Sequence, residues 1–78
     1  MDKIGLIAGY GQLPFLWAKQ AKKNNVNVYA FLISEDYSKD IEDEVYNIDY
    51  LSITQFDKLI KQLNSYNIKK VIMLGKVN

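Results

Sequence analysis

Two short segments of this 78-residue sequence carry residue types that could hold a phosphate group. The segment from Gly9 to Leu13 follows an apolar run and leads into a stretch with helical spacing. Its glycines let the backbone approach a ligand, and the free N–H groups at a helix start favour an anion. Gly75 and Lys76 follow the last apolar run, where the lysine could neutralise a phosphate. The candidate ligand-binding residues are Gly9, Tyr10, Gly11, Gln12, Leu13, Gly75 and Lys76.

Two other interpretations of the same glycines stay open. From spacing alone, a strand that needs glycine to turn into a helix explains Gly9 and Gly11 as well as phosphate binding does. Gly9-x-Gly11 would also open a dinucleotide fingerprint, with Glu35 or Asp36 near the distance expected of a ribose-binding acid. Pro14 occupies the place of the third glycine, which lets helix and strand pack closely in that fingerprint. We therefore expect Glu35 to play no ribose-binding part.

The sequence offers no nucleophile paired with a base. It contains no histidine and no cysteine, and no serine stands in a nucleophile-elbow sequence. Acidic residues cluster between positions 36 and 44, but such a charge run is typical of a solvent-exposed loop or helix face. Lys76 lacks the spacing of a P-loop. We expect no catalytic residue and no metal ligand in this chain.

The charge and hydropathy of the sequence argue against a nucleic-acid surface and against a transmembrane segment. Ten lysines against nine acidic residues leave a net charge of +1, and the lysines are scattered, which argues against a nucleic-acid surface. The apolar runs are far shorter than the roughly 20 residues that cross a bilayer, and no signal-peptide pattern opens the sequence. The expected location is the cytoplasm.

Hydrophobic periodicity predicts alternating strands and helices. The predicted strands cover Lys3–Ala8, Val26–Ile33, Val45–Ile48 and Lys70–Leu74, and the first helix covers Leu13–Lys23. A capping box from Ser52 to Gln55 predicts the start of the second helix. The apolar stripe predicted for the first helix is Leu13, Leu16, Trp17 and Ala21, and that of the second is Phe56, Leu59, Ile60, Leu63 and Tyr66.

The order β-α-β-β-α-β predicts an α/β fold with a parallel sheet. Strands that are apolar on both faces belong to sheets covered on both sides, and right-handed crossovers give the strand order 3-2-1-4. The two helices then lie on opposite faces and leave part of the sheet uncovered. Ligands of such sheets bind at the carboxyl ends of the strands, near the point between strands one and four.

Three sequence blocks together resemble the amino-terminal domain of the LpxI-type UDP-2,3-diacylglucosamine pyrophosphatases. Residues 4–14 read Ile-Gly-Leu-Ile-Ala-Gly-Tyr-Gly-Gln-Leu-Pro, residues 55–60 read Gln-Phe-x-Lys-Leu-Ile, and residues 75–77 read Gly-Lys-Val. The resemblance spans nearly the whole chain. It departs from the family pattern at Tyr10, where a small residue is expected, and at Thr54 and Asp57, where glycine is frequent.

The resemblance implies a Gram-negative bacterial hydrolase of lipid A biosynthesis that cleaves the diphosphate of UDP-2,3-diacylglucosamine to UMP and a lipid-linked sugar phosphate. It implies that residues 1–78 are an incomplete, Rossmann-like amino-terminal domain, inactive alone, with a separate catalytic rear domain that binds magnesium. The implied partners are the UDP-diacylglucosamine lipid and the enzyme's own carboxy-terminal domain. Peripheral contact with the inner membrane and a homo-oligomer stay open.

Two alternatives compete with this interpretation. A dinucleotide-binding domain of an oxidoreductase is disfavoured by Pro14 in place of the third glycine. A small non-catalytic binding or assembly module is disfavoured because such a module is expected to cap its last strand with a further helix.

Overall fold

The computed structural model of the protein describes residues 2–35, 37 and 39–76. The strands are β1 (Lys3–Ala8), β2 (Asn27–Leu32), β3 (Asn47–Tyr50) and β4 (Val71–Leu74). The helices are α1 (Leu13–Lys23), the short 3-10 helix η1 (Lys39–Asp43) and α2 (Phe56–Ser65). The predicted order β-α-β-β-α-β is confirmed, with η1 in the polar loop between β2 and β3.

All four strands run parallel in the order β3-β2-β1-β4, which confirms the predicted sheet. Ala8 pairs with Leu32 and with Leu74, and Leu32 pairs with Tyr50. The four strands therefore end level with one another. We call this end of the sheet the carboxyl edge, and the loops that follow all four strands leave from it.

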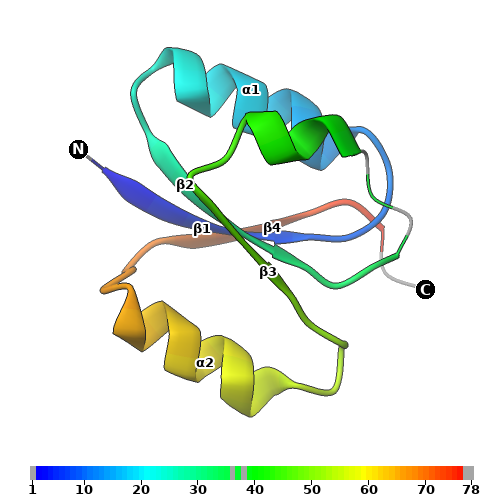
Figure 1. The fold of residues 1–78 in the computed structure, drawn as a ribbon, viewed down its shortest axis with the longest axis vertical. Helices are drawn as coiled ribbons and strands as arrows, with labels where there is room; N and C mark the ends of the chain where they lie inside the picture. Colours follow the sequence, from blue (N-terminus) through cyan, green and yellow to red (C-terminus); the bar gives the residue numbers. More distant parts are fainter. Residues whose placement is uncertain (1, 36, 38, 77–78) are drawn as a thin grey trace.

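Helices cover the sheet on both sides. Figure 1 shows α1 and η1 over one face and α2 over the other, so the fold has three layers. Two separate clusters of buried side chains lie between these layers. Across residues 2–35, 37 and 39–76, no helix is long and apolar enough to cross a membrane.

The face of α1 that meets the sheet differs from the predicted stripe. The buried residues of this helix are Pro14, Ala18 and Ala21, whereas Leu13 and Leu16 are exposed. Pro14, Ala18 and Ala21 are themselves spaced at i, i+4 and i+7, so they form one helical stripe of small side chains. Small residues let the helix lie close to the sheet. Ala21 belongs to the predicted stripe, whereas Pro14 and Ala18 were missed because the search for periodicity followed the larger apolar residues.

The apolar stripe of α2 is only partly buried. Leu59 is buried against Tyr29 and Phe31 of β2, and Leu63 and Tyr66 pack beside it. Phe56 and Ile60, predicted to belong to the same buried stripe, are 63% and 55% exposed. That prediction was wrong because only Leu59, Leu63 and Tyr66 of the stripe pack against the sheet, and the other two side chains lie outside this buried cluster.

Part of the sheet is accordingly left open beside α2. Val71 and Met73 of β4 are apolar and exposed. Together with Ile7 and the first turn of α2, Met73 lines an apolar groove of about 180 Å³. This agrees with the uncovered sheet surface predicted from the sequence.

Two element boundaries are shifted from their predicted positions. The third strand was predicted at 45–48 but covers 47–50, because the acidic Asp49 looked like a loop residue, whereas its carboxylate accepts hydrogen bonds from Gln62 and Tyr66. The second helix begins at Phe56, since Ser52 to Gln55 form a turn in front of it. Within this turn the Gln55 Oε1 accepts the Ser52 N–H at 2.8 Å, but the Ser52 hydroxyl pairs with that of Thr54. Only half of the predicted capping box is formed.

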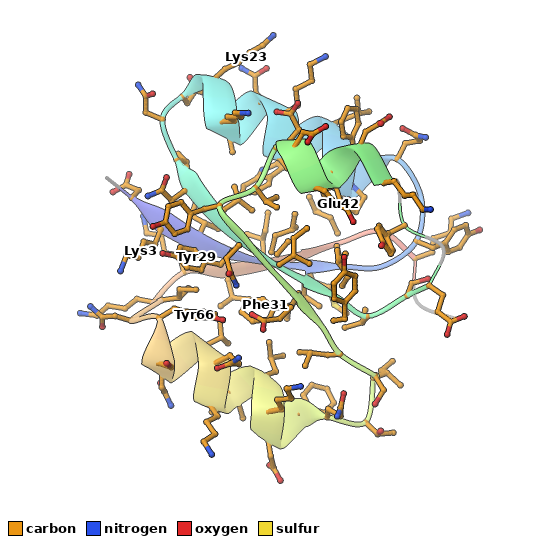
Figure 2. The ribbon with its side chains drawn as sticks, viewed as in Figure 1. Lys3, Lys23, Tyr29, Phe31, Glu42 and Tyr66 are labelled. Atoms are coloured by element: carbon orange, nitrogen blue, oxygen red, sulfur yellow. The ribbon has the colours of Figure 1, made fainter. Side chains whose placement is uncertain are left out.

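A polar network joins α2 to the edge strand β3. The Tyr66 hydroxyl donates to Asp49 Oδ2 at 2.9 Å, and the Gln62 amide donates to Asp49 Oδ1 at 3.2 Å. The Asn47 amide donates to both Asp49 Oδ2 and the Tyr66 hydroxyl. The Tyr66 ring also packs 5.0 Å from the ring of Tyr29 between the sheet and α2 (Figure 2). Tyr66 therefore fixes the end of α2 by packing and by hydrogen bonding.

Tyr66→Phe should lower the free energy of unfolding by about 1–2 kcal/mol at neutral pH, because the hydrogen bond to a carboxylate is lost while the ring stays. Burial, and then the hydrogen bond to Asp49, raise the pKa of Tyr66 above its ordinary value. The folded state therefore holds this proton more tightly than the unfolded chain does, so stability should fall as pH rises above about 10. Urea titrations at several pH values should show a shallower alkaline fall in Tyr66→Phe. Tyr46→Phe is the matched control, and an equal change there would contradict the assignment.

Candidate functional site

The two glycine-bearing segments predicted to hold a phosphate meet at the carboxyl edge. The Tyr10 N–H donates to the Lys76 carbonyl at 2.9 Å, and the Lys76 N–H donates back to the Tyr10 carbonyl at 3.0 Å. The Gly9 N–H donates to the Leu74 carbonyl at 2.8 Å. The loop after β1 and the loop after β4 are thus held together by backbone hydrogen bonds.

Gly9 and Gly75 are required by the close crossing of these two loops. A Cβ at Gly9 would overlap the carbonyl oxygen of Lys76. A Cβ at Gly75 would lie 2.9 Å from the carbonyl carbon of Gly9, a distance that side chains do not tolerate. These two glycines therefore have a structural reason independent of any ligand.

Gly11 is different, because nothing in the fold crowds it. No atom lies within 4 Å of a Cβ built at this position, and its φ of +111° is one that side-chain-bearing residues rarely adopt. The backbone at Gly11 is therefore shaped for a turn and is open on the side where a side chain would stand. A ligand can reach the main chain there.

An open groove of about 370 Å³ lies over this junction. Its lining residues are Tyr10, Gly11, Gln12, Leu13, Gly75 and Lys76. Six of the seven residues chosen from the sequence thus share one groove, and Gly9 lies buried behind it. The structure places these residues together, and their contact with a ligand stays a prediction.

The start of α1 at this groove is uncapped by the protein. Gln12 is the N-cap but makes no side-chain capping hydrogen bond, and the first turn contains no acidic residue. Pro14 has no N–H to offer, which leaves those of Leu13 and Phe15 in the first turn without helical partners. The positive end of the helix dipole is therefore not neutralised by a carboxylate of its own first turn.

Lys76 supplies the positive charge of this groove. Its Nζ lies 5.9 Å from the centre of the half-buried Tyr10 ring. Within the described part of the chain, the one ion pair joins Lys22 Nζ to Glu44 at 4.0 Å, so Lys76 has no carboxylate partner there. An anion in the groove would meet an ammonium group and helix-start N–H groups together.

A second groove, of about 440 Å³, lies at the ends of β2 and β3. Glu35, weighed in the sequence as a ribose-binding acid, lines it, whereas Asp36 lies outside the described residues. Tyr37 and Tyr50 also line it, and their rings pack with centroids 5.9 Å apart. The Tyr50 hydroxyl donates to Glu42 Oε2 at 3.1 Å. Sequence reasoning missed this tyrosine pair because Tyr37 comes from the loop after β2 and Tyr50 from the end of β3, and the two share no spacing pattern.

Hydrogen bonds among the two hydroxyls and Glu42 hold the tyrosine pair in place. The Tyr37 hydroxyl lies 3.4 Å from that of Tyr50 and 3.5 Å from Glu42 Oε2. The hydrogen bond with Tyr37, followed by burial and the hydrogen bond with Glu42, raises the pKa of Tyr50. The Tyr50 hydroxyl therefore keeps its proton at neutral pH and acts as a donor.

The acidic residues near η1 serve structural contacts. Glu42 contacts the tyrosine pair. Lys22 joins α1 to the end of η1 by donating to the Asp43 carbonyl at 2.7 Å, and it pairs with Glu44 just beyond. Throughout the described residues there is no group of three His, Cys, Asp or Glu side chains that could hold a metal ion. The donor set of these residues does not fit a magnesium site.

Comparison with known proteins adds the family. A family model described as the LpxI N-terminal domain matches residues 3–78, which is all but the first two residues. Neither the curated proteins nor the solved structures contain a match. A domain of this family suggests an LpxI-like enzyme of the lipid A pathway. With the predicted motifs, the parallel sheet and this match in agreement, the chain belongs to the LpxI N-terminal domain family.

Proposed function

We propose that this chain is the ligand-binding domain of a hydrolase that cleaves the diphosphate of UDP-2,3-diacylglucosamine to UMP and 2,3-diacylglucosamine 1-phosphate. Membership of the LpxI N-terminal domain family carries the proposal. The chain would work in the cytoplasm beside a carboxy-terminal domain and take a UDP-linked lipid. As the family resemblance implies, magnesium and the groups that activate water are assigned to that second domain.

The groove at Gly11 and Lys76 is the proposed binding site of the diphosphate. Helix-start N–H groups near Gln12 and Leu13 would donate to phosphate oxygens, and the helix dipole would favour their negative charge. The Lys76 ammonium would add a point charge from the neighbouring loop. Because Gly11 carries no side chain, the phosphate can approach the backbone closely.

The test is the affinity of the chain for UDP, measured by calorimetry beside the melting temperature. Lys76→Ala should weaken UDP binding about tenfold, as expected for a lost charge-assisted contact, and leave the melting temperature nearly unchanged. Its side chain is exposed, and the backbone hydrogen bonds to Tyr10 do not need it. Gly11→Val should weaken binding by a similar factor, since a branched side chain would occupy the open face of the turn.

Two controls separate binding from stability. Lys58→Ala removes an exposed lysine from α2 and should leave UDP affinity unchanged. Glu35 lines the second groove, so Glu35→Ala is tested with inorganic pyrophosphate as the probe, whose affinity should not change. Normal UDP binding by a folded Lys76→Ala protein would refute the proposed diphosphate site. A chain that binds NAD more tightly than UDP, and loses NAD binding in Glu35→Ala, would instead favour the dinucleotide-binding domain.

A further inference from the structure

The groove at the ends of β2 and β3 has the features of a binding site for a planar ring. Its floor is apolar, with Leu32 and Leu51 both buried. Its wall carries the tyrosine pair Tyr37 and Tyr50, whose rings are tilted by 54° and so do not stack flat on one another. Tyr50 is 55% exposed. The volume of about 440 Å³ lies within the range of small-molecule sites.

The ring pair is held in place by the acid beside it. Glu42 projects from η1 (Figure 2) and accepts the Tyr50 hydroxyl at 3.1 Å, with the Tyr37 hydroxyl 3.5 Å from the same oxygen. A ring fixed in this way loses little conformational freedom when a ligand stacks on it, which favours binding. Glu42 is therefore a positioning residue for this wall.

The tyrosine wall is joined directly to the turn at Gly11. Gly11 and Tyr37 form a parallel backbone bridge, so their main chains lie about 5 Å apart, as neighbouring strands do. The first groove lies over the ends of β1 and β4, and the second lies over those of β2 and β3. One ligand lying along the carboxyl edge can occupy both.

We propose that the Tyr37–Tyr50 groove binds the nucleoside of a nucleoside phosphate, with the base stacked on the tyrosines and the phosphate at the Gly11 turn. The inference rests on the proposed function, in which this nucleoside is uridine. Aromatic side chains stack on any base because every base has a π-face, and phosphate is the anion suited to a helix start. The apolar floor with polar groups at the rim suits a flat base that carries a hydroxylated sugar.

The test compares UMP with inorganic pyrophosphate on the full 78-residue chain. Tyr50→Leu and Tyr37→Leu should each weaken UMP binding about tenfold or more, since each removes a stacking surface. Pyrophosphate affinity should not change, because it has no base. Tyr50→Phe keeps the ring and should retain most UMP affinity, and Glu42→Gln should have an intermediate effect. Tyr46→Leu is the control, an exposed tyrosine just before the start of β3.

The possible results separate the two proposals. If UMP binds no more tightly than pyrophosphate, and its affinity is unchanged in both tyrosine variants, the proposed nucleoside site is wrong and the proposed phosphate site is supported. If UMP binding depends on the tyrosines but pyrophosphate does not bind, the proposed nucleoside site is supported and the proposed phosphate site is wrong. Absence of binding by either probe overturns both. Melting temperatures show whether each variant is folded.

Discussion

Gly9→Ala is expected to destabilise the chain by about 3 kcal/mol or more, because the added methyl group would overlap the Lys76 carbonyl oxygen. The obstacle is backbone that is held by two hydrogen bonds to Tyr10, so it cannot rotate away as a flexible side chain would. At roughly 0.05–0.15 kcal/mol per residue, a chain of 78 residues is stable by only about 4–12 kcal/mol. Urea unfolding should therefore show a large fall or no folded state.

Gly11→Ala is the matched control for this prediction. Its Cβ would meet no atom within 4 Å, so it should cost only the strain of a positive φ, about 1–2 kcal/mol. If Gly9→Ala proves as mild as Gly11→Ala, the loops after β1 and β4 do not cross as closely as the structure places them. In that case Gly11 and Lys76, which come from these two loops, would also lie farther apart than the proposed phosphate groove requires.

Phe31→Ala is expected to cost about 3–5 kcal/mol, the range for removing a buried aromatic ring. Phe31 is fully buried near the carboxyl end of β2, and the centre of its ring lies 6.4 Å from that of Tyr66. The cavity would open beneath α2, the one helix that covers this face. Chemical denaturation should show a large part of the total stability lost, accompanied by exposure of apolar surface to a dye such as ANS.

Phe56→Ala provides the comparison, because it removes the same side chain from an exposed position. Phe56 is 63% exposed, so the change should stay within about 0.5 kcal/mol. A cost at Phe56 as large as that at Phe31 would mean that the first turn of α2 is buried in solution, for example by a second copy of the chain. The structure would then need an additional contact on this face.

The position of the segment proposed to bind phosphate could be predicted because it depends on neighbours in the chain. A short apolar run, glycines and a proline at a helix start act through local backbone preferences, and these place the Gly9–Leu13 turn correctly after β1. The meeting of Gly11 with Lys76 in one groove also followed from the sequence, since level parallel strands in the order 3-2-1-4 bring these loops together.

Other features depend on which surfaces meet. The α1 face of Pro14, Ala18 and Ala21 is set by how closely that helix can approach the sheet, and no hydrophobicity pattern reports this. The exposure of Phe56 follows from the open groove that it lines beside Met73. In both helices the predicted helical period is right, but packing decides which side chains are buried.

The sequence by itself determined the α/β class, the strand order, the glycine turn and the family, because these depend on local patterns and on the handedness of crossovers. Only the tertiary structure decided that Tyr37, Tyr50 and Glu42 form one wall beside that turn. Tyr37 lies in a loop, Glu42 in η1 and Tyr50 at the end of β3. Their contact depends on the parallel pairing of β2 with β3 and on the position of η1. Residues that meet only through long-range packing leave no periodic signal in the sequence.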